Sequence, residues 1–147
     1  MHNAHPRRRI SRGRVVQAVR RVVRGERRVR AQISVVFTDT RRIARLNARY
    51  LRHRGSTDVI SFTLGEPRTL EGEIYVNLDR ARTQARAYGV PYALEVSRLV
   101  VHGTLHLLGY DDATVEARLR MKRHEDRYLG LPVRRSRTRG RNERKSG

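Results

Sequence analysis

The hydrophobic and polar positions of this chain recur with two different periods, which predict a mixture of helices and strands. Over residues 11–25 the valines and Ala18 recur at helical spacing with arginines on the opposite face, and Ser11 is a good N-cap. Over residues 31–37 an alternating run rich in Val and Ile predicts a strand. Asp39 can cap a second helix that runs to about residue 50, with Ile43 and Leu46 directed inward.

The rest of the pattern places strands early and helices late. The further elements expected are a short edge strand at 1–6, strands at 58–63 and 73–77 joined by a loop, a helix capped by Asp79 at 79–88, a helix opened by Pro91 at 91–108, and a last helix at 113–129 with Val115, Leu119, Met121 and Tyr128 available for packing. This order predicts a single α+β domain, in which a small twisted sheet packs on the strongly apolar helix 91–108.

Length and composition limit the class of protein. The 147 residues fit one domain over residues 1–131, followed by a basic tail at 132–147 that has almost nothing to bury and is expected to be disordered. No apolar run is long enough to span a bilayer, and the basic N-terminus lacks the hydrophobic stretch of a signal peptide. The chain has no cysteine, so any metal must be held by nitrogen and oxygen. We therefore expect a cytoplasmic protein with no membrane partner.

The net charge of +20 is concentrated at the two ends of the chain. Residues 1–37 carry a net +10, residues 38–131 a net +4 and residues 132–147 a net +6, and nearly all of the cations are arginine. Such a surface attracts a polyanion, and arginine both binds phosphates in a bidentate manner and stacks on bases. RNA is the expected partner, although a codon bias toward arginine would give the same composition.

The chemistry of the chain is concentrated between His102 and Asp112. His102 and His106 are four residues apart and therefore share a helix face, so both imidazoles can bind one ion. Gly109 stands where a helix C-terminus favours the left-handed conformation, which lets Asp111 or Asp112 turn back toward the rings. The alternative is a pair of core histidines satisfied by hydrogen bonds. Two imidazoles, a glycine and a carboxylate at this spacing favour a metal site with an open position, which is typical of catalysis.

Two further observations narrow the site. Gly103 stands where a zinc protease of the His-Glu-x-x-His type carries its general base, so ordinary metalloprotease chemistry is disfavoured. The remaining histidines are isolated in polar contexts and are expected to be ordinary surface residues; these are His2, His5, His53 and His124.

The segment from His102 to Asp111 resembles the His-Gly-x-Leu-His-Leu-x-Gly-Tyr-Asp-His signature of the bacterial YbeY-type endoribonucleases, which are metal-dependent rRNA maturation factors. Upstream blocks of the family are similar in order and spacing to Leu46-Asn47-x-x-Tyr50, residues 57–62 and residues 72–74, so the resemblance covers about residues 30–130. It implies an α+β domain of about four strands and five helices, with the metal at the mouth of a basic groove. It also implies single-stranded RNA, above all rRNA, as substrate, a role in ribosome quality control, and the small ribosomal subunit or its proteins as partners.

The chain departs from the family pattern at two positions. Asp112 replaces the third histidine ligand, so the expected ligands of one divalent ion, with zinc as the first choice, are His102, His106 and Asp112. Leu51 replaces an arginine thought to be catalytic or to contact RNA. We expect Arg52 to take the catalytic role and Arg49 and Arg54 to contact RNA, although each is equally compatible with a solvated surface arginine.

The sequence does not identify the proton acceptor, and the candidates are a hydroxide on the ion, Asp111 and Glu73. We expect Asp111 to cap the last helix and not to act in catalysis. Three functions compete: a metal-dependent endoribonuclease, a non-catalytic ribosome-assembly protein with a structural metal, and a metal hydrolase of another substrate such as a peptide.

Overall fold

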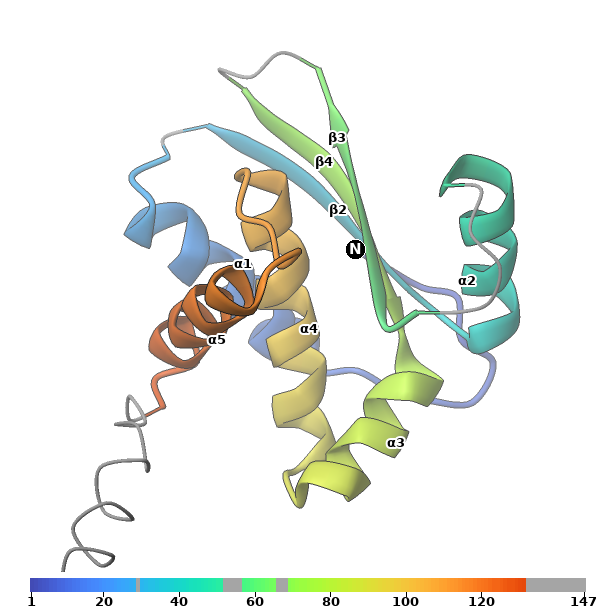
Figure 1. Ribbon diagram of the computed structural model, residues 1–147. Helices are drawn as coiled ribbons and strands as arrows, with labels where there is room; N and C mark the ends of the chain where they lie inside the picture. The colour runs from blue at the N-terminus through green and yellow to red at the C-terminus, as the bar shows by residue number, and fades with distance from the viewer. Residues whose placement is uncertain (29, 52–56, 66–68, 132–147) are drawn as a thin grey trace, which may run out of the picture.

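The computed structural model describes residues 1–28, 30–51, 57–65 and 69–131, and the side chain of Leu51 is not part of that description (Figure 1). The elements are β1 (His2–Asn3), α1 (Arg12–Gly25), β2 (Ala31–Thr38), α2 (Thr40–Leu46), a π-helical turn η1 (Asn47–Leu51), β3 (Val59–Leu64), β4 (Leu70–Asn77), α3 (Leu78–Tyr88), α4 (Tyr92–Leu107) and α5 (Val115–Tyr128). This is the α+β domain with four strands and five α-helices that the pattern and the family resemblance predict.

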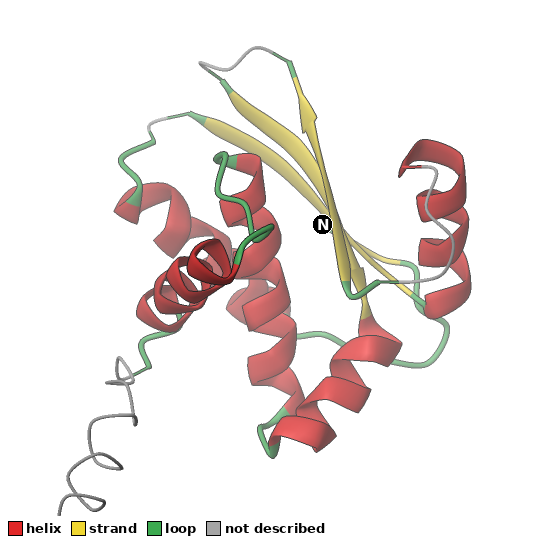
Figure 2. Cartoon of the chain, viewed as in Figure 1, coloured by secondary structure: helices red, strands yellow, loops and turns green. Residues whose placement is uncertain are grey.

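The four strands form one mixed sheet in the order β1-β2-β4-β3. β2 runs parallel to β1 and β4, whereas β3 pairs with β4 in the antiparallel direction and forms an edge. Helices α1, α4 and α5 lie on one face of the sheet and α2 lies on the other (Figure 2). The chain between the parallel strands β2 and β4 forms α2, η1 and the edge strand β3. Because α2 lies on the face opposite to α4, the two faces of the sheet are covered by different helices.

The main core lies between the sheet and α4, because side chains alternate between the two faces along each strand. On β4 the residues Ile74 and Val76 point toward α4 and are fully buried, as are Val100 and Leu105 of the helix itself. A helix that is apolar on most faces is expected at such a central place. The prediction that α4 is the central helix is therefore confirmed.

The close approach of α4 to the sheet depends on Gly103. A Cβ built on this residue would lie 2.7 Å from Cγ2 of Ile74 and 3.1 Å from Oγ of Ser61, so any larger residue would need a neighbour to move. The Ser61 hydroxyl donates a hydrogen bond of 2.9 Å to the Gly103 carbonyl oxygen. The glycine between the two histidines thus allows the helix to contact the edge of the sheet.

Several element ends differ from the sequence prediction for identifiable reasons. β4 begins at Leu70, inside the predicted loop, because it pairs with β2 over its whole length. The cap of α3 is Asn77, whose side chain accepts from the Arg80 N–H, and not Asp79. Thr114 caps α5, and the first residue of that helix, Val115, is 63% exposed. Leu119 is 52% exposed, so it does not pack as predicted, whereas Met121 and Tyr128 are buried.

Two histidines that were expected at the surface have partners in the fold. His5 has a side chain only 5% exposed, and its Nε2 lies 2.8 Å from Oδ1 of Asp79. The His124 ring lies between the rings of Tyr110 and Tyr128, at centroid distances of 4.7 and 6.4 Å. The prediction was wrong for His5, because its partner Asp79 is 74 residues away in the sequence. His124 is partly exposed, and one of its partners, Tyr128, is four residues away on the same helix. His53 and the tail 132–147 lie outside the described residues.

Among the helices that the structure describes, none is long and apolar enough to cross a membrane.

Candidate metal centre

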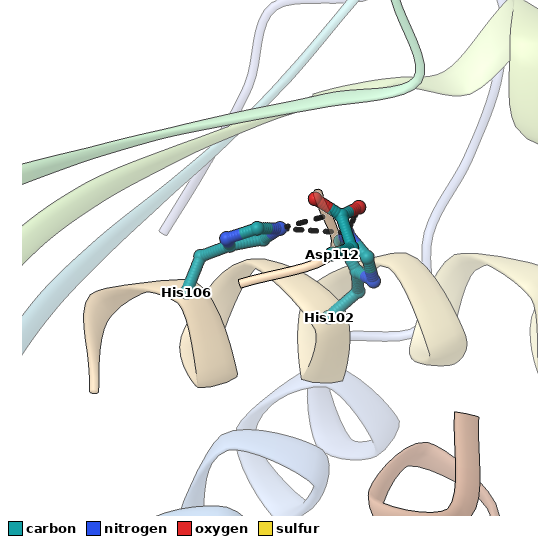
Figure 3. Close-up of side chains that lie close together, drawn as sticks. All are labelled: His102, His106 and Asp112. Carbon is teal, nitrogen blue, oxygen red and sulfur yellow. Dashed lines mark hydrogen bonds and ion pairs between the residues drawn. The ribbon is translucent and has the colours of Figure 1, made fainter. Parts of the chain in front are cut away.

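The two histidines of α4 point to the same place, as their spacing predicts (Figure 3). Nε2 of His102 and Nε2 of His106 are 3.0 Å apart, and both rings are partly buried. The rings meet edge to face with centroids 4.6 Å apart. Two imidazole nitrogens at this distance must share a proton, as in a hydrogen bond, or a cation, so the arrangement is compatible with a bound metal ion.

Asp112 completes the group because the chain reverses after α4. Gly109 adopts φ +98°, and the N–H of Tyr110 donates to the carbonyl oxygen of Leu105, so the helix ends in a left-handed turn. Oδ2 of Asp112 then lies 3.4 Å from Nε2 of His102 and 3.7 Å from Nε2 of His106. The expected turn at Gly109 is confirmed, and it brings the carboxylate to the imidazoles.

These three side chains fit a divalent metal ion. Their ligand atoms lie within 4.8 Å of one another. Tetrahedral zinc with bonds of about 2.0–2.1 Å separates its ligand atoms by roughly 3.3 Å, and the observed separations run from 3.0 to 3.7 Å. Two nitrogens and one oxygen leave further coordination positions open, which is the pattern of catalytic and not of structural zinc.

Glu125 of α5 holds the ring of His102, and sequence reasoning did not identify it. Its Oε2 lies 2.7 Å from Nδ1 of His102, which leaves Nε2 directed at Asp112 and His106. The other oxygen of Glu125 accepts from Arg98, and Arg98 also donates to Asp126 at 3.0 Å. A carboxylate behind a ligating imidazole fixes the tautomer and the orientation of the ring.

The two imidazoles differ in their electrostatic surroundings. Burial lowers the pKa of His102, but the hydrogen bond and negative charge of Glu125 outweigh this effect and raise it overall. Burial and the nearby positive charge of His102 lower the pKa of His106, so its neutral form, which is the form that ligates a metal, is favoured.

The turn that carries Asp112 is anchored to α1. The hydroxyl of Tyr110 donates to Oε1 of Glu26 at 2.5 Å, and the hydroxyl of Tyr128 donates to the other oxygen of the same carboxylate. These hydrogen bonds and the charges of His124 and Arg127 lower the pKa of Glu26 in spite of its partial burial, which acts in the opposite direction. Glu26, the C-cap residue of α1, therefore links the turn that carries Asp112 to α5.

A groove of about 660 Å³ opens beside two of the three candidate ligands, His102 and Asp112. It runs between α4 and α5, and its lining includes Asp58, Arg98, His102, Asp112, Arg118 and Lys122. Carboxylates outnumber the Arg and Lys side chains in this lining, so the basic groove that the family resemblance implies was wrong for this part of the site.

The other site residues predicted from sequence do not join this group. Glu73 accepts from the hydroxyl of Tyr75, and both residues lie on the sheet face opposite to α4, so Glu73 was wrong as a general base for this centre. Asp111 accepts from the N–H of Ala113 at 3.3 Å, so it closes the turn, while Thr114 caps the helix. Arg49 lies exposed in η1 on the α2 side of the sheet. Arg52 and Arg54 lie outside the described residues.

Comparisons with known proteins identify the family of this chain. The family model described as Endoribonuclease YbeY matches residues 1–131. A protein named Endoribonuclease YbeY from Chlorobium luteolum is 39% identical over 129 residues, which cover 88% of this chain and 93% of that protein. A protein of the same name from Salinibacter ruber is 39% identical over 134 residues, or 85% of each chain. The solution structure of TM1509 from Thermotoga maritima has a TM-score of 0.57 and 26% identity, and the match covers 80% of this chain and 81% of that one. The chain therefore belongs to the Endoribonuclease YbeY family.

Proposed function

We propose that this protein is a metal-dependent endoribonuclease that cleaves single-stranded RNA. The observation that supports this most strongly is the convergence of His102, His106 and Asp112 on one point beside an open groove, in a chain whose family is named for RNA cleavage. Residues 1–131 form the catalytic domain in this proposal, and the family match over the same residues supports that boundary.

In the proposed site His102, His106 and Asp112 hold one divalent ion, with zinc the first candidate. Such an ion, when bound, would polarise a phosphoryl oxygen and activate the attacking water. Glu125 keeps Nε2 of His102 free to ligate by accepting the proton of Nδ1. Arg118 and Lys122 line the groove and are the cations that an RNA phosphate would contact there, while Glu125 and Asp126 of the same lining are paired with Arg98.

The biological setting follows from the family and the charge. We infer that the substrate is rRNA, that the protein acts in rRNA maturation and ribosome quality control in the cytoplasm, and that the small ribosomal subunit or its proteins are its partners. The net +6 of residues 132–147 adds affinity for such a polyanion. Among the predicted arginines, Arg52 remains the candidate for the catalytic role that the family assigns to the position of Leu51, and Arg54 remains a candidate RNA contact.

A cleavage assay distinguishes this proposal from its alternatives. Purified protein should be freed of metal with a chelator and then given labelled single-stranded RNA with and without Zn²⁺ or Mn²⁺. We expect cleavage only with metal, no cleavage by His102→Ala, and unchanged cleavage by His2→Ala, which alters an exposed histidine of β1. Metal content of each variant should be measured in parallel. Stoichiometric metal without RNA cleavage would instead indicate a structural ion or another substrate.

A further inference from the structure

A second concave surface lies on the sheet face opposite to the metal centre, where α2 and η1 cover β2 and β4 (Figure 1). We call it the α2 groove. It has a volume of about 350 Å³, and the lining residues that matter here are Thr38, Arg42, Arg45, Arg49, Tyr50 and Tyr75. The alternation of β4 places Tyr75 on this side, while its neighbours Ile74 and Val76 pack in the core against α4.

Aromatic rings form one wall of the α2 groove. Tyr50 packs edge to face on Phe62, which packs edge to face on Tyr75, and both centroid distances are 5.8 Å. Tyr50 is nevertheless 58% exposed. The ring is therefore held in place by Phe62 while much of its surface remains open to solvent. A fixed and exposed aromatic ring of this kind is a surface on which an unpaired base can stack.

Arginines form the other wall. Arg45 and Arg49 are both exposed and stand four residues apart, and the guanidinium carbon of Arg49 lies 5.5 Å from the ring centroid of Tyr50. Within the described part of the chain, neither makes an ion pair with a carboxylate, whereas the guanidinium of Arg42 donates to the carbonyl oxygen of Ala4. Because the Arg49 guanidinium lies over the Tyr50 ring, a stacking base would use the part of the ring that Arg49 leaves exposed, with its phosphate beside the two guanidinium groups.

The floor of the groove adds a polar group. Thr38 is 2% exposed, and its hydroxyl has no hydrogen-bond partner among the described residues. The alternation of β4 places the acids Glu71 and Glu73 on this face, and Glu73 accepts a hydrogen bond from the hydroxyl of Tyr75, which helps raise the pKa of that phenol to about 12. Tyr75 therefore stays neutral at physiological pH, and its ring adds apolar surface without charge.

We propose that the α2 groove binds a segment of single-stranded RNA, with phosphates on Arg45 and Arg49 and a base stacked on Tyr50. Single strands are favoured over duplex because stacking on Tyr50 needs a base whose face is free. The contact lies on the opposite face of the sheet from His102 and His106, so it would hold RNA without taking part in its cleavage. The inference deepens the proposed function, since it rests on the same single-stranded RNA substrate and gives a location to the expected RNA contact of Arg49, but the binding it describes does not require the metal centre.

Equilibrium binding of a fluorescently labelled oligoadenylate, measured by anisotropy in a chelator so that no cleavage occurs, tests this proposal. Tyr50→Ala should raise the Kd about fivefold or more, in line with about 1–3 kcal/mol for one stacked base, and Tyr50→Phe should retain most of the affinity. The double variant Arg45→Ala/Arg49→Ala should lower the slope of log affinity against log salt by roughly 1.4, since each single-strand phosphate contact contributes about 0.7.

The matched control is Arg120→Ala/Arg123→Ala, which removes the same charge from exposed positions of α5, on the other side of the sheet. Circular dichroism should report whether each variant is folded. If Tyr50→Ala is not folded, the affinity and salt slope of Arg45→Ala/Arg49→Ala test the proposal instead. Equal affinities and equal salt slopes for the two double variants would overturn the proposal, as would equal affinity for duplex and single strand. His102→Ala should lose cleavage and keep this binding, so failure of the nuclease proposal would be seen separately.

Discussion

Nδ1 of His102 and Oε2 of Glu125 lie 2.7 Å apart and join the candidate metal helix α4 to α5. Since this contact fixes which nitrogen of His102 faces the other ligands, removing the carboxylate should free the ring to rotate and to change tautomer. We expect Glu125→Ala to weaken Zn²⁺ binding by about 10- to 100-fold, the usual effect of losing an outer-shell partner. Competition with a chromophoric chelator measures this change.

The control for that experiment is Asp126→Ala. Asp126 accepts from the same Arg98 as Glu125 but makes no hydrogen bond or ion pair with His102, so its loss disturbs the ion-pair network and leaves the ring in place. Equal losses of zinc affinity in the two variants would show that the network as a whole stabilises the site and that Glu125 has no special effect on His102.

Asp112 is the point where the chain leaves the family pattern. A carboxylate is a harder ligand than imidazole and carries a negative charge, so the site should discriminate less between zinc and manganese than a three-histidine site does. Asp112→His should tighten zinc binding, and Asp112→Ala should weaken it by about 10-fold or more. Titrations that superimpose for the wild type and both variants would show that Asp112 is not a ligand.

Gly103 should tolerate no larger residue, because α4 contacts the sheet at this point. The added methyl group of Gly103→Ala would lie 2.7 Å from Cγ2 of Ile74, which is fully buried and has no room to move. We expect a loss of about 1–3 kcal/mol in the free energy of unfolding, measured with urea. Gly13→Ala is the control, since a Cβ there meets nothing within 4 Å, and it should leave stability unchanged or raise it by up to about 1 kcal/mol.

The sequence predicted those parts of the site that depend on local geometry. His102 and His106 follow from helical spacing, and the return of Asp112 follows from Gly109, because both rules act within a few residues. Glu125 was missed because its partner is 23 residues away on another helix. One signal was present: Met121, Glu125 and Tyr128 recur at helical spacing, so the acid stands on the buried stripe of α5, where an unpaired charge is costly.

Tertiary contacts likewise decided the parts of the fold that the pattern did not predict. Glu73 was one candidate for the general base, and it lies in the family-like block 72–74. The alternation of β4, however, turns its side chain to the sheet face opposite the histidines. His5 was placed at the surface because its neighbours are polar, but β1 pairs with β2 and brings it to Asp79. Neither outcome can be inferred from spacing, since both depend on which strands pair.

The buried Glu95 of α4 should make the folded protein less stable as pH rises. Its side chain is 2% exposed, its Oε1 has no hydrogen bond among the described residues, and the nearest cation, Arg98, is 3.9 Å away. Burial, opposed by the charge of Arg98, raises the pKa of Glu95 to about 7. Between about pH 4.5 and 7 the native state therefore keeps a proton that the unfolded chain has already released. The contribution of Glu95 to the free energy of unfolding falls as pH rises through this window and is constant above it.

Glu95→Gln removes that titration and keeps the shape of the side chain. In urea unfolding with a chelator present, the variant and the wild type should be equally stable near pH 4. At pH 8 the variant should be more stable by up to about 3 kcal/mol, because a pKa raised by this much corresponds to that free energy for a side chain excluded from water. Glu116→Gln, which alters an exposed acid in the first turn of α5, should show no such gain. If wild type and Glu95→Gln lose stability in parallel between pH 4.5 and 7, Glu95 is ionised in the native state throughout, and its charge must be satisfied by Arg98.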